Sequence, residues 1–228
     1  MSAVKLAKWC IFTVPINEDY LANPNTPRDW HCQKARAGRG ALGDLAAHVV
    51  NMAHFLDGNI DEVSGDMMTV IKQRPDLKNS SQLRDVENED QASALLRFAN
   101  DAHGVIETSR IACSSKMGLT YVVAGTKGSI RYTQEHMAEL ELYIHDKPAR
   151  HQGFKTILTG PAHPDYAAFC ISAGHSIGFN DQKTPEVRDL INGIAADDRM
   201  WTDFAEGLQV SKVLEAIALS AAEGPIPS

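Results

Sequence analysis

Six short segments between residues 63 and 144 have the length and the composition of β-strands. They are residues 63–71, 92–98, 104–112, 119–124, 129–132 and 139–144. In the last of them aliphatic residues alternate with glutamate and tyrosine, which is the period of a strand with one buried face. Turns such as residues 125–128 are too short for the crossover that parallel pairing needs, so the pattern predicts antiparallel neighbours.

Helices are predicted on both sides of this run of strands. Before it, apolar residues recur at three- and four-residue steps over residues 41–56, which indicates a helix with one apolar stripe. After it, the loop-rich residues 147–184 lead to two helices, and the second begins at Asp203 with Glu206 as its capping-box partner. A further strand is expected at residues 8–14.

This order of elements predicts an α+β fold with a large, mostly antiparallel open sheet and helices packed on one face. The length suits a single domain over residues 1–228, with no Rossmann domain, because no alternation of strands and helices precedes the sheet. Trp9, Phe98 and Phe204 are expected in the core. The uncovered sheet face predicts a homo-oligomer, since a large exposed face otherwise invites aggregation.

Composition excludes several classes of protein. The net charge of −7 argues against nucleic acid or an acidic membrane surface as a partner, because both require a basic patch. No apolar segment is long enough for a membrane span, and the first residues lack the features of a signal peptide. The 4 cysteines are scattered and do not resemble a disulfide framework, which predicts a reducing cytoplasm. The histidines of the loop are too widely spaced for a metal site, so no metal is expected.

Residues 38–43, Gly-Arg-Gly-Ala-Leu-Gly, match the dinucleotide-binding pattern GxGxxG. That pattern predicts nucleotide binding only where it follows a buried strand and opens a βαβ unit. The preceding residues 28–36 are polar and charged, so we interpret the glycines as a tight entry into a helix.

Asp44 and His48 lie four residues apart on the predicted helix, hence on one face. A histidine can remove the proton of a hydroxyl group while a carboxylate orients its ring, which is the chemistry of alcohol oxidation. An exposed ion pair between neighbouring helical side chains has the same spacing and is common.

Residues 37–48 resemble the glycine-rich D-x-G-x-H helix of the glucose–fructose oxidoreductase, inositol dehydrogenase and MocA family. Further stretches resemble the same family, and the likeness extends over nearly the whole chain: residues 17–21 with Trp30, residues 87–90, 106–110, 125–129 and 160–164, and Gly174 with His175. The chain is similar to the family's C-terminal domain, whose open sheet builds dimers and tetramers. This chain departs from the family at Ala46 and Ala47, where a glycine and a small polar residue are usual; the methyl group of Ala46 is expected where backbone or substrate would approach closely.

The resemblance implies a specific chemistry. Asp44 and His48 would be catalytic in a dehydrogenase that oxidises a secondary hydroxyl of a cyclic polyol or sugar with NAD or NADP. The family's third catalytic residue, a lysine in an E-K-P motif, belongs to its Rossmann domain, and the sequence contains no E-K-P. Neither cofactor is therefore expected to bind this chain alone, and a separate Rossmann-domain protein is one conceivable partner.

Six residues are candidates for binding the polyol or sugar: Asn17, Asp19, Tyr20, Trp30, His163 and His175. The first three could hydrogen-bond substrate hydroxyls or only shape their own loop by turn formation. The two histidines could line the mouth of a pocket or a subunit contact, or be solvated.

Three interpretations of the chain remain open. It is a fragment of a two-domain dehydrogenase, a subunit of a split enzyme, or a non-catalytic domain kept for sugar binding or oligomerisation. In the third case Asp44 and His48 would be relics.

Overall fold

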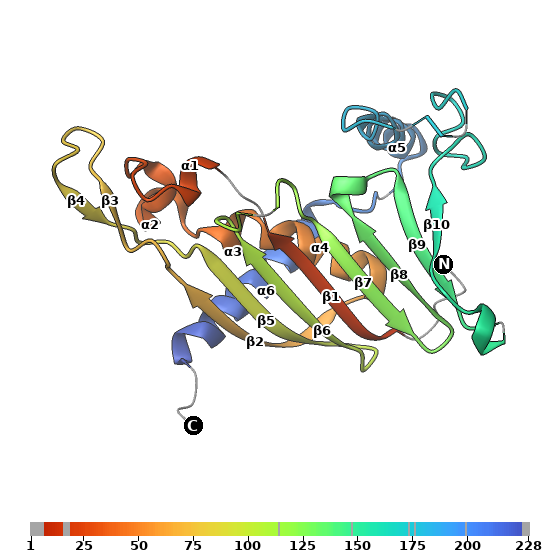
Figure 1. The fold of residues 1–228 in the computed structure, drawn as a ribbon, viewed down its shortest axis with the longest axis horizontal. Coiled ribbons are helices and arrows are strands. Elements are labelled where there is room, and N and C mark those ends of the chain that lie inside the picture. Colours follow the sequence, from red (N-terminus) through yellow and green to blue (C-terminus); the bar gives the residue numbers. More distant parts are fainter. Residues whose placement is uncertain are drawn as a thin grey trace.

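The computed structural model describes residues 7–15, 19–113, 115–146, 148–172, 174–175, 177–198 and 200–224. Its central sheet contains β1 (Ala7–Pro15), β2 (Ile60–Met68), β5 (Gln91–Phe98), β6 (His103–Ser109), β7 (Thr120–Gly125), β8 (Gly128–Thr133), β9 (Glu139–Ile144) and β10 (Lys155–Leu158). These 8 strands lie in the order β10-β9-β8-β7-β1-β6-β5-β2 (Figure 1). The prediction of a large, mostly antiparallel sheet is confirmed.

Strand β1 lies in the middle of the sheet, between β6 and β7. It pairs parallel with β6, in a register that places Phe12 beside Ile106, and antiparallel with β7. Between β1 and the next strand of the sheet the chain passes through helices, and this long connection gives it the freedom to enter the middle of the sheet in either direction.

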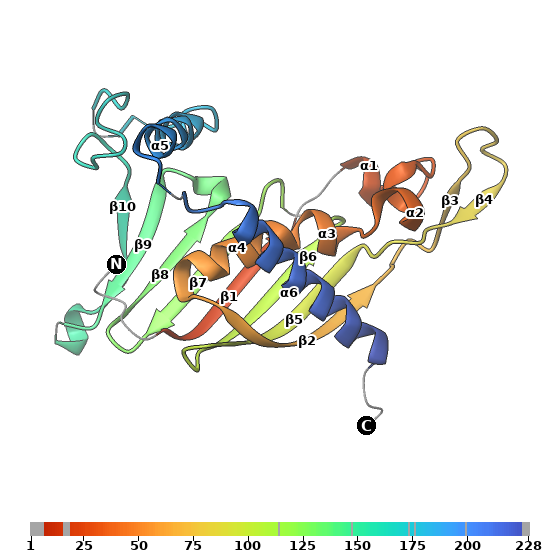
Figure 2. The ribbon, with the colours of Figure 1, turned by 180° about the vertical axis from the view of Figure 1, so that it is seen from behind.

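Two helices cover one face of the sheet, α4 (Ala46–Asp57) and α6 (Phe204–Glu223), as Figure 2 shows. The shorter helices α1 (Asp19–Ala22), η2 (Trp30–Cys32), α2 (Lys34–Ala37) and α3 (Ala41–Asp44) lie near one end of the sheet, beside a hairpin of β3 (Gln73–Pro75) and β4 (Leu83–Asp85). Three other elements lie toward the opposite end, near β8 to β10: η3 (Gln134–His136), η4 (Ala149–His151) and α5 (Lys183–Ala196).

The core lies between the sheet and α4 and α6. Strand β5 shows why: Ala92, Ala94, Leu96 and Phe98 are buried, and the intervening residues are more exposed. Helix α6 contacts β2 so closely that a Cβ atom at Gly65 would lie 2.5 Å from the carbonyl oxygen of Ile217. Each large aliphatic or aromatic side chain that is fully buried in this layer contributes roughly 1.5–3 kcal/mol to folding.

Three expectations require correction. The helix predicted over residues 41–56 is interrupted at Leu45, which separates α3 from α4. Of the aromatic residues expected in the core only Phe98 is buried; Trp9 is 45% exposed and Phe204 is 100% exposed. A side chain at the first position of a helix points away from the sheet as readily as toward it, and the residue type alone does not decide this.

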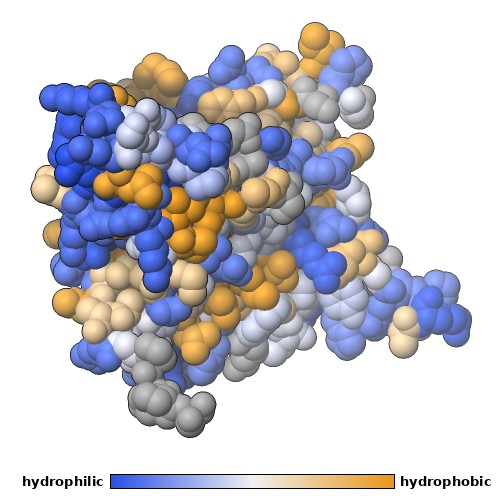
Figure 3. Space-filling view, turned by 60° about the vertical axis from the view of Figure 1, so that its left-hand side comes forward, coloured by the Kyte–Doolittle hydropathy of each residue, from blue (hydrophilic) through white to orange (hydrophobic). Residues whose placement is uncertain are grey.

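The face of the sheet opposite α4 and α6 is uncovered in the described part of the chain (Figure 1). It exposes apolar side chains, among them Leu95, which is 63% exposed, and Leu158, which is 52% exposed. Seen obliquely from the end of the sheet that carries the hairpin, the molecule shows orange apolar patches interrupted by hydrophilic ones (Figure 3).

Candidate active-site cleft

The glycine run at residues 38–43 forms the junction between α2 and α3. Gly38 ends α2 with φ of 74°, a left-handed conformation that glycine adopts without strain. A Cβ atom at Gly40 would lie 2.0 Å from the carbonyl oxygen of Glu89. The Glu89 carboxylate accepts the N–H groups of Gly40 and Leu42 at 2.7 and 3.0 Å. Because these N–H groups are already bound to a carboxylate, this run does not fit the phosphates of a dinucleotide.

A buried ion pair lies directly behind this junction. Asp90 is fully buried, and its Oδ1 contacts the guanidinium of Arg110 at 2.9 Å. Its Oδ2 accepts the N–H groups of Val70 and Ile71 at 2.8 and 2.9 Å. Together with the carboxylate of Glu89, the pair fixes the start of α3 against the ends of β5 and β6.

Asp44 and His48 follow from this fixed start. Asp44 is the last residue of α3, and its N–H donates to the carbonyl of Gly40 at 3.1 Å. His48 lies in the first turn of α4, where its N–H donates to the carbonyl of Leu45 at 3.2 Å. Both side chains are exposed, and both line one cleft of about 900 Å³. Leu45 between the two helices keeps a helical backbone conformation, with φ of −89° and ψ of −40°, so the four-residue spacing still places the two residues on the same wall.

The cleft runs between α4, the first turns of α6 and the segment that leads into α5. Its lining includes six residues that sequence reasoning did not assign to a substrate site: Asn51, Met117, Gln134, Phe179, Lys183 and Glu206. Asn51 follows His48 by three residues, so helical spacing alone could have found it. The others come from distant parts of the chain and carried no local signal.

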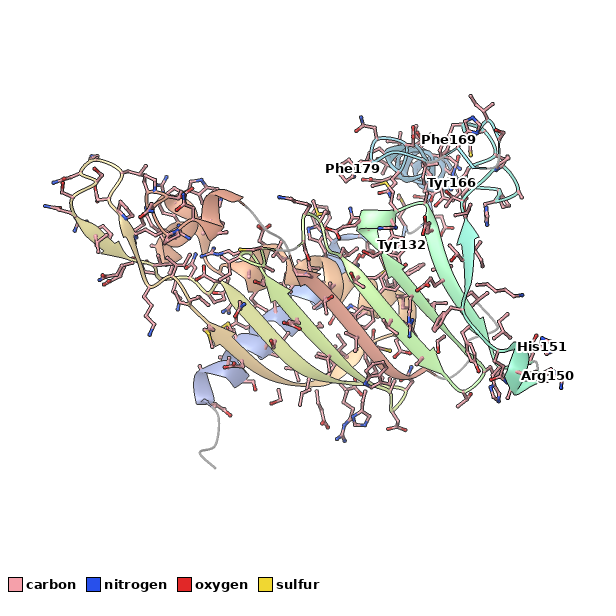
Figure 4. All side chains as sticks on the ribbon, viewed as in Figure 1. Tyr132, Arg150, His151, Tyr166, Phe169 and Phe179 are labelled. Atoms are coloured by element: carbon pink, nitrogen blue, oxygen red, sulfur yellow. The ribbon has the colours of Figure 1, made fainter. Side chains whose placement is uncertain are left out.

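Aromatic side chains gather near α5, and one of them, Phe179, lines the cleft. Tyr132, Tyr166, Phe169 and Phe179 gather where the loop segment meets the end of β8 (Figure 4). Tyr121 stacks on Tyr132 with ring centroids 5.0 Å apart. Burial, and then the neighbouring Tyr166, raise the pKa of Tyr132, so its hydroxyl remains protonated at neutral pH.

Three of the six predicted substrate residues can be placed relative to this cleft. Trp30, His163 and His175 are not among the residues that line it. Trp30 stacks on His31 at a ring distance of 3.7 Å, and Ser172 Oγ lies 2.6 Å from His175 Nδ1. Asn17 lies outside the described residues. Asp19 and Tyr20 belong to α1, but their side chains are outside the description as well.

Three other expectations concern the methyl group of Ala46, a metal site and a membrane span. The methyl group of Ala46 is fully buried in the core, so it packs against the protein and does not crowd a substrate. Among the described residues, no three or more histidine, cysteine or acidic side chains converge as metal ligands would. No helix in the described ranges is long and apolar enough to span a membrane.

Comparison with known proteins places the chain in a family. Residues 10–131 match the model of the GFO/IDH/MocA C-terminal domain, and the chain belongs to this family. Levoglucosan dehydrogenase of Pseudarthrobacter phenanthrenivorans is 34% identical over 217 residues, which are 90% of this chain and 56% of the dehydrogenase.

Solved structures agree with this assignment. An NAD binding oxidoreductase from Klebsiella pneumoniae superimposes with a TM-score of 0.91 at 37% identity, covering 98% of this chain and 59% of that one. Levoglucosan dehydrogenase in complex with NADH and L-sorbose gives a TM-score of 0.89 at 35% identity, covering 97% of this chain and 58% of that one. The chain thus spans little more than half the length of the relatives it matches.

Proposed function

We propose that this chain is the substrate-side domain of a nicotinamide-dependent dehydrogenase that oxidises a secondary hydroxyl of a cyclic polyol or sugar. One observation carries the proposal: Asp44 and His48 line the same large cleft, on a helix start that a buried network holds in place. The matched levoglucosan dehydrogenase, a sugar-derivative dehydrogenase by name, supports the reaction class.

In this proposal His48 removes the proton of the substrate hydroxyl, and Asp44 orients the imidazole and stabilises its charged form. The chain's own contribution is to bind the ring and to hold the acceptor of the proton at the reacting oxygen. A bound NAD or NADP would supply the acceptor for the hydride that leaves the same carbon. Because the glycine run does not fit a dinucleotide, the cofactor is expected on a Rossmann domain outside this chain, joined to it or separate.

The proposal is tested by joining a Rossmann domain to this chain. The Rossmann portion of levoglucosan dehydrogenase is fused to this chain at the domain boundary, and NADH formation is followed with levoglucosan and a panel of inositols and hexoses. The same relative, cut and rejoined at the same junction, shows that the junction permits activity. We expect turnover of at least one neutral ring by the fusion, and neither NADH binding nor turnover by the chain alone.

Two variants assign the activity to the pair. His48→Asn in the fusion should lower kcat by roughly 10²–10⁴-fold, the usual contribution of a general base, and Asp44→Asn should lower it by less. A fusion that folds and binds NADH but oxidises none of the compounds, while the rejoined relative remains active, would contradict the catalytic role. It would favour a non-catalytic sugar-binding or oligomerisation domain.

We also propose that the uncovered sheet face joins copies of this chain. Its support is the exposure of Leu95 and Leu158 on that face. Sedimentation should give a dimer or tetramer, and Leu95→Lys should shift it toward the monomer, whereas Leu219→Lys on the outer side of α6 should not. A monomeric wild-type chain would refute this assembly.

A further inference from the structure

The acidic residue Glu206 lies in the first turn of α6 and enters the cleft wall from the side opposite α4. Its N–H donates to the side chain of Asp203 at 2.9 Å, which confirms the predicted helix start. The predicted reciprocal half of the capping box is wrong, because the Glu206 carboxylate turns toward α4. The backbone of the first turn is thus fixed by Asp203, and the Glu206 side chain is available for another purpose.

The Glu206 carboxylate is held by two donors from α4. Asn51 Nδ2 lies 3.1 Å and His54 Nδ1 lies 2.8 Å from the same oxygen, Oε1. Among the described contacts Oε2 receives no hydrogen bond from the protein. The side chain of Glu206 is 14% exposed and that of His54 is 4% exposed. The carboxylate is therefore oriented before any ligand arrives, with one oxygen bound and one left over.

Holding the carboxylate in this way has a cost to the protein. His54 Nε2 is buried and has no hydrogen-bond partner among the described residues. A buried polar atom without a partner costs about 1–3 kcal/mol. A glutamate that pointed into solvent would leave the Asp203 cap of this helix unchanged, so the capping of α6 does not account for the pairing of Glu206 with Asn51 and His54.

The rest of the cleft fits a neutral ligand with many hydroxyl groups. Among the described residues that line it, Asp44 and Glu206 carry carboxylates, whereas Lys183 already contacts Glu186 at 2.7 Å. Such a lining repels phosphate and carboxylate groups on a ligand. The exposed ring of Phe179 on the far wall offers an apolar surface for the C–H face of a ring.

We infer that Glu206 is a substrate-anchoring residue, whose free carboxylate oxygen accepts hydrogen bonds from ring hydroxyls next to the one that is oxidised. The substrates would accordingly be neutral, unphosphorylated polyhydroxylated rings. This inference rests on the proposed function, because it places the substrate in the cleft of Asp44 and His48. It extends that function by naming a residue that selects the substrate but does not take part in the proton transfer assigned to His48.

The experiment uses NMR titration of the full chain and of the fusion with its bound cofactor, with levoglucosan, myo-inositol and their monodeoxy analogues as probes. Glu206→Gln removes the charge but retains an oxygen that can accept from Asn51 and His54. Glu215→Gln is the matched control, because Glu215 lies on the same helix and is paired with Arg39 away from the cleft. The melting temperature of each variant is measured in parallel.

We expect Glu206→Gln to weaken binding of the neutral ring roughly 10- to 100-fold, as loss of a charge-assisted hydrogen bond does. The wild type should bind one particular monodeoxy analogue more weakly than the parent ring, by a similar factor. The variant should bind that analogue almost as well as it binds the parent ring. The affinity for glucuronate, relative to that for the neutral ring, should be higher in the variant than in the wild type. The control variant should leave every one of these values unchanged.

Two kinds of failure are distinguishable. If the wild type binds a neutral ring and Glu206→Gln binds it equally well, the anchoring role is wrong and the proposed function stands. The anchoring role is also wrong if the variant loses stability and affinity together without any change among the deoxy analogues, since that outcome indicates a purely structural contact between α4 and α6. If no ring binds to either wild-type protein, the proposed function fails and this inference fails with it.

Discussion

Replacing Gly40 by alanine tests the interpretation of the glycine run more sharply than any other change. The new Cβ atom would lie 2.0 Å from the carbonyl oxygen of Glu89, whereas ordinary contacts begin at 3.4 Å. The carbonyl oxygen belongs to the backbone of Glu89, and a Cβ atom is fixed rigidly to the backbone of residue 40. No flexible side chain can therefore move aside to relieve the contact. The junction between α2 and α3 must shift by more than an ångström, and that shift pulls the N–H groups of Gly40 and Leu42 away from the Glu89 carboxylate.

The magnitude follows from those two contacts. Each is a hydrogen bond to a charged group, worth about 1.5–3 kcal/mol, so we expect Gly40→Ala to destabilise the chain by about 3–6 kcal/mol. The assay is urea denaturation followed by circular dichroism. Gly207→Ala is the control: it lies inside α6 with no atom within 4 Å of the new Cβ, and it should stabilise the chain by about 1 kcal/mol.

The functional consequence is equally definite. The carbonyl of Gly40 accepts the N–H of Asp44, so a displaced Gly40 also displaces one member of the proposed catalytic pair. In the fusion with a Rossmann half, kcat should fall together with stability. A Gly40→Ala protein within about 1 kcal/mol of the wild type would refute the close approach, and the glycine would then require another explanation.

Two further variants test the buried groups. Asp90→Asn should destabilise the chain by about 3–5 kcal/mol in urea, because it leaves the Arg110 guanidinium buried without its anion; a loss below about 1 kcal/mol would show that water reaches Arg110. Burial, and then Asp57, raise the pKa of the Cys10 thiol, so its stabilising effect is full below the unfolded pKa of about 8.5 and is lost as the pH rises above it. Cys10→Ser should therefore reduce the decline of unfolding free energy between about pH 8 and 9.5, and equal slopes for the two proteins would contradict the burial of a protonated thiol.

Most of the sheet could be predicted from the sequence because most of its strands carry their own evidence; the exception is β10 (Lys155–Leu158), which lies in residues expected to be loop. The alternation within β9 and the small turn before β8 are local patterns, and both are found in the structure. The place of β1 was not predictable in this way. Its partners, β6 and β7, lie about a hundred residues away, and nothing in its nine residues specifies which strands it will join.

The residues of the candidate site also differ in whether a local pattern predicts them. Asp44 and His48 could be paired from their spacing, and the family resemblance supplied the chemistry. Trp30, His163 and His175 were chosen by type and by resemblance, and they are not among the described residues that line the cleft. A polar residue in an irregular loop has no periodicity that predicts which way it faces.

Glu206 shows why some features could be predicted from the local sequence and others could not. Local spacing correctly predicted that Asp203 would begin α6, since a helix start depends only on the next few residues. The same rule failed for the Glu206 side chain, because its partner His54 is 152 positions away in the sequence. A carboxylate that leaves its own helix and is held instead by a distant buried histidine has a tertiary role. Here that role lies in the wall of the cleft that holds Asp44 and His48, so the failed local prediction itself directs attention to the site.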